Sequence, residues 1–240
     1  MADPPVVVAF TTWNRPHYLE RVLDAWSRVR GIGSASLLFS CEPGCREVTE
    51  MCEAVTFADW TVTVNECQTG AMLNTRRALD AAFRLSDYAI LATDDFLPST
   101  DMLELHAWHR DNYRDDPSVL ALVCGRGDAA DGGPAAVWRS QVMGWLPGFH
   151  AAKWAVLSER WEESARVPGG WYPWIDSRFL LTGEYDVLLP ALSRAQDIGE
   201  AGGTGAAPSR CFSEHYPPQE YFEVTGKREH GLDFRVEECP

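Results

Sequence analysis

The stretch YAILATDD, residues 88–95, decides the fold class of this chain. Its apolar run predicts a hydrophobic strand that ends at a polar step. The residues that follow, 98–101, predict the start of a helix, because Ser99 or Asp101 can cap it and Glu104 stands one turn beyond. An acidic pair therefore ends a strand and precedes a helix.

Strands and amphipathic helices alternate on the N-terminal side of this stretch. Apolar residues after Pro16 recur at the spacing of one helix face as far as Val29, and a second helical pattern runs over residues 73–85. Such alternation predicts βαβ units and a mostly parallel sheet. The predicted strands are residues 6–10, 36–40, 61–65, 88–92 and 119–124.

The second half of the chain is less regular. Gly, Ala and Pro are concentrated in residues 128–136 and 199–208, with several tryptophans between the two segments. This composition predicts loops over the open edge of the sheet. No internal repeat divides the chain, so we expect one domain over residues 1–240.

Composition limits the classes of function. The chain has 240 residues, of which 45% are hydrophobic and 23% charged, as in an ordinary globular protein. Its net charge of −14 disfavours broad contact with nucleic acid, although a local patch of Arg76, Arg77 and Arg84 could face phosphates. No apolar run approaches the roughly 18 residues of a membrane span, and the seven cysteines are irregularly spaced, so we expect a cytoplasmic protein without a membrane partner.

Asp94 and Asp95 can carry metal chemistry. Ligands of open parallel sheets bind outside the carboxyl ends of the strands, where this pair is expected. One carboxylate can hold Mg²⁺ or Mn²⁺ while the other orients water or a ribose, and such a cation stabilises a departing diphosphate. The alternative is a solvated turn before Pro98. The position of the pair after several strand units favours the metal site.

The chain resembles the inverting GT-A glycosyltransferases, especially those similar to N-acetylglucosaminyltransferase I. The resemblance rests on VVVAFTTWNRPHYL, ILATDDFLPSTDML, GWLPGFHAAKWAVLSERW, WYPWIDSRF and LSRAQDIG, which follow the family's order over about residues 6–199. It implies an α/β, Rossmann-like αβα sandwich that moves a hexose or N-acetylhexosamine from a nucleotide-diphosphate sugar, in particular a UDP-sugar, to a hydroxyl. Thr93 stands where the family usually has Glu.

The same resemblance implies a donor site in about residues 1–100. Asp95 would be the direct ligand of Mn²⁺ or Mg²⁺, with Asp94 near the ribose. Thr11, Arg15 and Glu42 would lie along the base and ribose of the nucleotide. The alternatives are that Arg15 braces its turn and that Glu42 is a solvated loop carboxylate.

The resemblance also implies a general base in the acceptor-binding half, about residues 101–240. Inversion requires a carboxylate that takes the proton of the acceptor hydroxyl, and Asp176 in WYPWIDSRF matches the family's position. The alternative is that Asp176 caps a helix over residues 177–181. His215 follows LSRAQDIG, where some relatives carry a further metal ligand. His106 and His109 share a helix face and are expected at the surface.

Several tryptophans could pack against a sugar ring or a nucleobase. Trp154 and Trp161 are spaced for the buried face of a helix and are expected in the core. The others that we single out stand beside Gly or Pro in loop-like sequence and are expected on the acceptor side: Trp145, Trp171 and Trp174.

Two other functions stay open. A sugar-phosphate nucleotidyltransferase shares a similar layout, but it should carry a glycine-rich loop after the first strand, where this chain has TTWNRP. A non-catalytic nucleotide-sugar-binding module would keep the fold without turnover. For the acceptor, the likeness to small phage-type DNA-modifying glycosyltransferases favours a 5-hydroxymethylpyrimidine in DNA, in a bacterial cell or a phage-infected host. A glycan or surface polysaccharide is the alternative.

Overall fold

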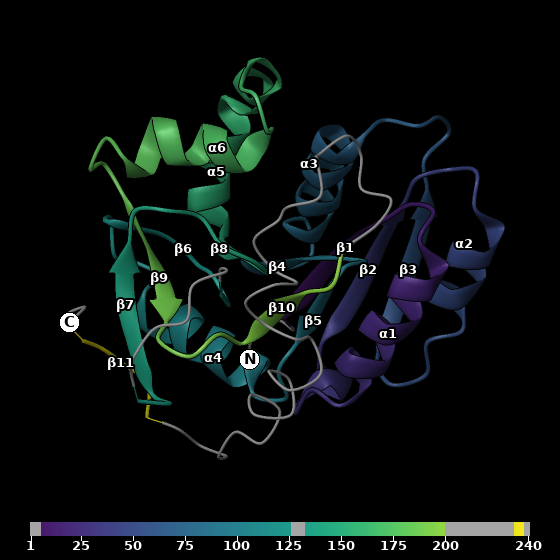
Figure 1. Cartoon of the computed structure of the whole chain (residues 1–240), viewed down its shortest axis with the longest axis horizontal. Helices are drawn as coiled ribbons and strands as arrows, with labels where there is room; N and C mark the ends of the chain where they lie inside the picture. The colour runs from purple at the N-terminus through teal and green to yellow at the C-terminus, as the bar shows by residue number, and fades with distance from the viewer. Residues whose placement is uncertain (1–5, 126–132, 200–232, 238–240) are drawn as a thin grey trace.

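A central nine-stranded sheet organises the chain (Figure 1), in the strand order β11-β7-β9-β6-β8-β4-β1-β2-β3. The computed structural model describes residues 6–125, 133–199 and 233–237. The strands are β1 Val7–Thr12, β2 Ser36–Cys41, β3 Asp59–Val64, β4 Tyr88–Thr93, β5 Phe96–Pro98, β6 Val119–Leu122, β7 Ala136–Ser140, β8 Gly148–His150, β9 Asp186–Pro190, β10 Ala195–Asp197 and β11 Arg235–Val236. The α-helices are α1 Pro16–Ser27, α2 Arg46–Glu53, α3 Ala71–Ala82, α4 Met102–Asn112, α5 Ala151–Glu159 and α6 Trp171–Ile175.

The N-terminal half is the parallel sheet that the sequence predicts. β1 pairs in parallel with β2 on one side and with β4 on the other, and β2 pairs in parallel with β3. Thr11 near the end of β1 is in register with Thr93 at the end of β4. The carboxyl ends of these strands therefore meet at one edge of the sheet.

The second half contributes strands between the two Gly-, Ala- and Pro-rich stretches, which the sequence did not predict. Of those stretches, residues 128–132 and 200–208 lie outside the described residues. β8 pairs antiparallel with β4 and β6, β6 pairs in parallel with β9, and β7 joins β9 antiparallel. β8 has 3 residues, and β7 and β9 have 5 each. Strands this short do not repeat an alternating pattern long enough to be recognised among Gly, Pro and Trp. The sheet as a whole stays mostly parallel.

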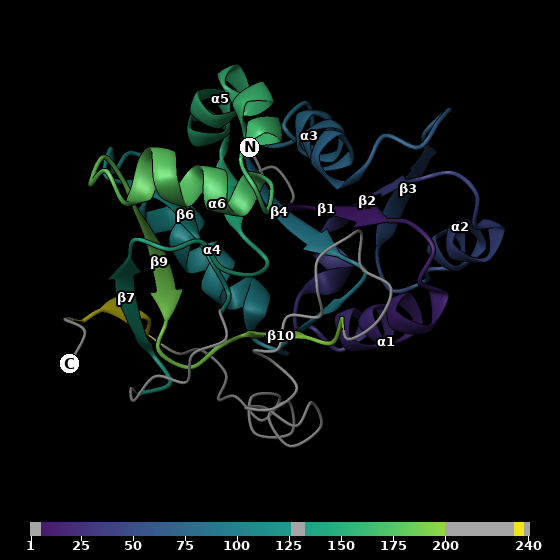
Figure 2. The same ribbon diagram turned by 45° about the horizontal axis from the view of Figure 1, so that its top comes forward.

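Alternation along the strands builds a core on each face of the sheet. Val8 and Phe10 of β1 pack with α1 on one face, while Val7 and Ala9 pack with Ala78 of α3 on the other. α4 joins the first layer, and α5 and α6 join the second. Figure 2 shows α1 and α3 on opposite sides of β1 and β2. The result is the expected αβα sandwich.

A cluster of buried histidines lies between α4, β4 and β8, contrary to the expected surface position of His106 and His109. The two residues are 0% and 1% exposed. Tyr88 Oη lies 2.8 Å from Nδ1 of His106 and 2.9 Å from Nδ1 of His109, and His150 packs edge-on against the Tyr88 ring. The tyrosine hydroxyl gives one ring nitrogen of each imidazole a partner in the core, while Nε2 of His109 is buried without one among the described residues.

No helix in the part of the chain that the structure describes is long and apolar enough to span a membrane.

Candidate active site

Arg15 forms ion pairs with both carboxylates of the acidic step, which comprises Asp94 and Asp95 at the end of β4. It follows β1, and its guanidinium forms an ion pair with each carboxylate: Nη2 contacts Oδ1 of Asp94, and Nη1 lies 2.8 Å from Oδ2 of Asp95. A planar guanidinium suits this arrangement because it carries several N–H donors in a fixed geometry. Arg15 therefore braces the carboxyl edge of the sheet through these two ion pairs.

Asp94 is buried and only partly satisfied. The residue is 3% exposed, and burial raises the pKa of its carboxyl, while the charge of Arg15 opposes that rise. Its Oδ2 atom is buried and has no hydrogen-bond partner in the described structure. An unmet acceptor of this kind at a strand end is suited to a hydroxyl group of a ligand.

Asp197 is a site residue that sequence reasoning missed. β10 pairs antiparallel with β5, with Asp197 opposite Phe96, which follows the acidic step directly. A Cβ atom placed on Gly199 would lie 3.0 Å from Oδ2 of Asp95 and 3.1 Å from Oδ1 of Asp197, so both carboxylates border the same small space. Burial, with a smaller contribution from the charge of Asp95, raises the pKa of Asp197 to about 6. The clue in the sequence was the acidic residue of LSRAQDIG, on a strand too short to predict.

The pair of Asp95 and Asp197 fits a hard cation that completes its coordination from a ligand. No three His, Cys, Asp or Glu side chains within residues 6–125, 133–199 and 233–237 form a ready-made metal site. Mg²⁺ is commonly bound by one or two carboxylates together with phosphate oxygens and water. Two carboxylates crowded into a partly buried space also gain from a positive charge between them. His215 lies outside the described residues.

Glu42 is buried at the end of β2, so the alternative of a solvated loop carboxylate is wrong. The residue is 4% exposed and accepts two hydrogen bonds from Thr69, at 2.8 Å from the backbone N–H and 2.7 Å from the hydroxyl. Glu42 thus fixes the loop that leads into α3. Thr11 lies half-buried on the neighbouring strand.

A second polar network, which the sequence did not predict, lies beside Glu42. Asn74 of α3 accepts hydrogen bonds from Ser40 at 2.6 Å and from Asn65 at 2.9 Å. Arg77, on the next turn of the helix, donates to Asn65 at 3.0 Å. These contacts tie the ends of β2 and β3 to α3, so the edge that holds Glu42 is rigid.

Asp176 lies inside a continuous helical segment, which makes the capping alternative wrong. α6 runs directly into a π-helical turn, Asp176–Leu180, and Asp176 itself has helical dihedral angles of φ −54° and ψ −52°. A capping residue would instead have a non-helical backbone. Its Oδ1 accepts a hydrogen bond of 2.7 Å from the backbone N–H of Met143. Single π-turns within helices are frequent at functional sites.

The phenol of Tyr172 feels the charge of Asp176 and of two other carboxylates. The half-buried Tyr172 precedes Asp176 by one helical turn. Burial raises the pKa of the Tyr172 phenol, and nearby negative charges raise it further. These charges belong to Asp95, Asp197 and Asp176. The second half of the chain thus brings Asp197 to the edge that holds Asp95, and the charges of both act on Tyr172 together with that of Asp176.

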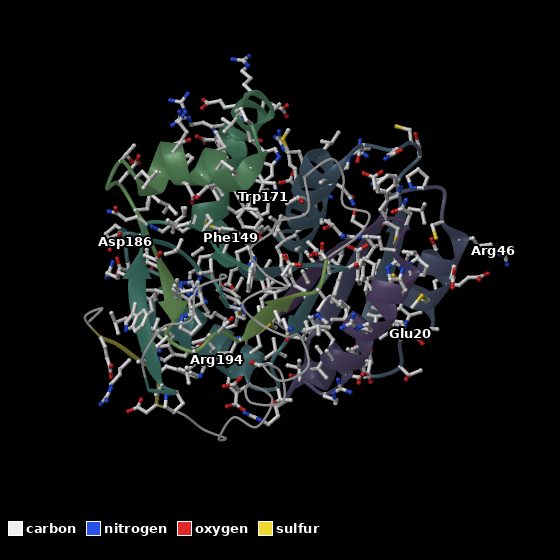
Figure 3. All side chains as sticks on the ribbon, in the orientation of Figure 1. Glu20, Arg46, Phe149, Trp171, Asp186 and Arg194 are labelled. Carbon is white, nitrogen blue, oxygen red and sulfur yellow. The ribbon has the colours of Figure 1, made fainter. Side chains whose placement is uncertain are left out.

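The three tryptophans expected on the acceptor side lie in different environments. Trp174 is 0% exposed in the core, so it offers no surface to an acceptor, and that assignment is corrected. Trp171 is 8% exposed and turns from α6 toward the interior (Figure 3), where its ring supports Tyr172. Trp145 is half-buried and stacks on Phe96, with 5.6 Å between ring centroids. Trp154 and Trp161 are buried, which confirms their prediction as core residues.

Arg76, one of the three arginines considered for phosphate binding, and Arg110 on α4 are both engaged by acidic side chains, while Arg77 donates to the neutral Asn65. Arg76 pairs with Glu162 at 2.6 Å and with Asp80 at 3.6 Å, and Arg110 pairs with Asp111 at 2.8 Å. Helix α3, which carries Arg76, and helix α4, which carries Arg110, cover opposite faces of the sheet. Their positive charges are therefore dispersed and locally neutralised.

Some solved structures have a fold similar to that of this chain. The chain is similar to residues 1–349 of S. aureus TarS in complex with UDP-GlcNAc, with a TM-score of 0.59 and 11% identity over 92% of this chain and 64% of that one. It is also similar to the same TarS fragment in complex with UDP, with a TM-score of 0.55 and 12% identity over 78% of this chain and 58% of that one. The chain thus spans about three fifths of these TarS fragments.

No family model matches the chain, and no curated protein matches it in sequence. At this low identity the solved structures inform on architecture alone. The mixed sheet, its strand order and its helix layers give this chain the α/β fold of the GT-A glycosyltransferases.

Proposed function

We propose that this chain is a nucleotide-sugar-dependent glycosyltransferase that works with inversion and with a divalent metal ion. One observation carries the proposal: Asp94, Asp95 and Asp197 gather at the carboxyl edge of a GT-A-type sheet, where Arg15 pairs with the first two. That edge is where open α/β sheets bind their ligands. The similar TarS structures were solved with UDP and with UDP-GlcNAc, which supports a nucleotide sugar as donor. We treat residues 1–240 as one catalytic domain.

The nucleotide occupies the ends of β1, β2 and β4 in this proposal. The buried Oδ2 of Asp94 accepts a hydrogen bond from a ribose hydroxyl, which meets its missing partner. Thr11 and the loop held by Glu42 border the base. Arg15 keeps the two carboxylates in place, and its positive charge lies close to where a diphosphate would bind.

Asp95 and Asp197 would hold Mg²⁺ or Mn²⁺, with phosphate oxygens and water as the other ligands. When bound, the cation neutralises negative charge on the departing nucleoside diphosphate. His215 stays a candidate for a further ligand.

Asp176 is the proposed general base. The hydrogen bond from the backbone of Met143 holds one carboxylate oxygen and orients the other. As the acceptor oxygen bonds to the anomeric carbon, its proton passes to Asp176. The bond from that carbon to the diphosphate oxygen breaks, and its electron pair leaves with the nucleotide. No atom changes its oxidation state overall, so the transfer needs no oxidant or reductant.

We propose a neutral hydroxyl acceptor, such as a glycan, in place of DNA. Trp145 and Phe96 form a stacked aromatic surface beside the acidic step, which suits the apolar face of a sugar. The carboxylates of Asp94, Asp95 and Asp197 disfavour a phosphate backbone at this edge, and Arg76 and Arg110 are paired with acidic residues. Hydroxymethylated DNA is kept as an arm of the test.

The test is release of nucleoside diphosphate from UDP-glucose, UDP-GlcNAc, UDP-galactose and GDP-mannose with Mn²⁺, using mono- and oligosaccharides or hydroxymethylcytosine DNA as acceptors. We expect turnover by the wild type, and loss of at least about 100-fold in Asp95→Ala and in Asp176→Ala. Asp24→Ala, at an exposed position on α1, is the matched control. Turnover that survives both active-site substitutions would refute the proposed site. Mass gain on DNA alone would overturn the glycan acceptor.

A further inference from the structure

Oδ2 of Asp95 is the atom at which Arg15 and the proposed cation would meet. The other carboxylate oxygen, Oδ1, accepts a hydrogen bond from the hydroxyl of Thr93. Oδ2 forms the ion pair with Nη1 of Arg15 at 2.8 Å. The same Oδ2 borders the small space beside Gly199 that it shares with Oδ1 of Asp197. A cation between Asp95 and Asp197 would therefore need the oxygen atom that Arg15 already contacts.

The guanidinium and a divalent cation repel one another at this separation. The repulsion is stronger where water is limited, and this site is enclosed: Arg15 and Asp95 are half-buried, and Asp94 is buried. The charge of Arg15 also acts on Asp197, because burial raises the pKa of that carboxyl and Arg15 opposes the rise. Arg15 thus supplies positive charge to the same carboxylates that the cation would use.

Arg15 can release Asp95 without releasing Asp94. Its two terminal nitrogens contact different carboxylates, Nη2 that of Asp94 and Nη1 that of Asp95. Its backbone is fixed at the start of α1, where its carbonyl oxygen accepts hydrogen bonds from the N–H groups of Tyr18 at 3.1 Å and Leu19 at 3.0 Å. Release of Nη1 therefore requires movement of the side chain alone. The freed N–H donors of a guanidinium suit the oxygens of a phosphate.

We propose that Arg15 and the divalent cation compete for Oδ2 of Asp95, and that the diphosphate of the nucleotide resolves the competition by accepting Nη1 of Arg15. Arg15 keeps its contact with Asp94 throughout. This inference rests on the proposed function and adds an order of binding to it: the protein alone binds the cation weakly, and the protein with a diphosphate binds it firmly. The coupling between cation and nucleotide acts equally in both directions.

The experiment measures Mn²⁺ binding without nucleotide by electron paramagnetic resonance, and UDP binding in saturating Mn²⁺ by calorimetry. We expect Arg15→Gln to bind Mn²⁺ at least about 3-fold more tightly than the wild type, because the competing guanidinium is gone. It should bind UDP at least about 10-fold more weakly, as for loss of a hydrogen bond to a charged group. Arg30→Gln is the matched control and should change neither affinity, since Arg30 lies beyond the other end of α1 and pairs with Glu104 at 2.6 Å.

Two further variants separate the exchange of contacts from simpler effects. Arg15→Lys keeps the charge but replaces the planar fork with a single ammonium, so it should restore the weak Mn²⁺ binding of the wild type without restoring the UDP affinity. If Arg15→Gln does not fold, because Asp94 is left buried without its partner, Arg15→Gln combined with Asp94→Asn is compared with Asp94→Asn alone. The same two changes in affinity are expected between these variants.

Three results would overturn the proposal. Weaker Mn²⁺ binding by Arg15→Gln would mean that Arg15 builds the cation site and does not compete for it. Unchanged UDP affinity would mean that the guanidinium does not pass to the diphosphate, and full recovery of both affinities by Arg15→Lys would mean that charge alone acts. In each case the wild type still binds Mn²⁺ and UDP, so the proposed function survives. A wild-type chain that binds neither would overturn the function and this inference together.

Discussion

Acidification should destabilise this protein through its buried histidines, and His106 allows the size of the effect to be calculated. The residue is fully buried, with Nδ1 at 2.8 Å from the Tyr88 hydroxyl and Nε2 at 3.1 Å from the sulfur of Cys124. Burial lowers the pKa of His106 to about 3, only partly opposed by a hydrogen bond with the backbone of Leu146. The folded protein therefore excludes a proton that the unfolded chain accepts.

The sign and size follow from proton linkage. A histidine in the unfolded chain has a pKa of about 6.5, so its contribution to stability is complete above that pH and is lost as the pH falls toward the folded value. Each pH unit in that window costs about 1.4 kcal/mol, which gives His106 a loss of about 2 kcal/mol between pH 7 and pH 5. Burial also lowers the pKa values of His109 and His150, so the wild type should lose more than His106 alone accounts for.

The assay is urea unfolding followed by tryptophan fluorescence at pH 7 and pH 5 at constant ionic strength. His106→Gln should lose about 2 kcal/mol less than the wild type between these two pH values. The comparison uses the change with pH, so a lower absolute stability of the variant does not affect it. His17→Gln, at an exposed position on α1, should behave as the wild type does. If His106→Gln does not fold at pH 7, His109→Gln takes its place. Equal pH dependence in wild type and cluster variants would refute the linkage argument.

Three further predictions concern the elements that position the site. Asp101→Asn should lower the free energy of unfolding by about 3–5 kcal/mol in urea titrations, because it leaves the fully buried Arg194 without its ion-pair partner; a loss under 1 kcal/mol would contradict this. Gly148→Ala should lower the free energy of unfolding by about 1–3 kcal/mol in thermal unfolding, because the added Cβ would collide with the Tyr88 hydroxyl. An unchanged melting temperature would disprove that collision. Asp197→Asn should weaken Mn²⁺ binding in the presence of UDP at least about 10-fold by electron paramagnetic resonance, and unaltered binding would remove Asp197 from the metal site.

The sequence predicted the N-terminal half well because its patterns are long. Each of β1 to β4 has 6 residues, and α1 and α3 have 12 each, enough for their apolar periods to be recognised. The predicted strands over residues 36–40 and 88–92 match β2 and β4 to within one residue. The short strands after residue 125 carry no comparable signal, and their place in the sheet is decided by pairing partners far along the chain.

The site residues also differ in whether a long sequence pattern or a distant pairing partner sets their position. The acidic step at 94–95 and Glu42 follow long strands, so their meeting at one edge could be predicted from topology. The placement of Asp197 beside Asp95 could not be predicted, because it depends on a three-residue strand paired across a separation of about a hundred residues. His106 was expected at the surface because its helix face was judged without the Tyr88 hydroxyl that satisfies it.

The buried ion pair of Asp101 and Arg194 explains how the second half of the chain is held at the edge that carries Asp95. Arg194 immediately precedes β10, and its Nε atom lies 3.2 Å from Oδ2 of Asp101, with both side chains 0% exposed. Asp101 stands at the start of α4, just after β5, and Ser99 donates a 2.6 Å hydrogen bond to its other oxygen. The pair therefore fixes the end of β5 against the start of β10, at the end of this two-stranded sheet away from Asp95 and Asp197. Because removing one partner from a buried pair is costly, this contact sets the position of Asp197 relative to Asp95 more firmly than two strands of three residues could.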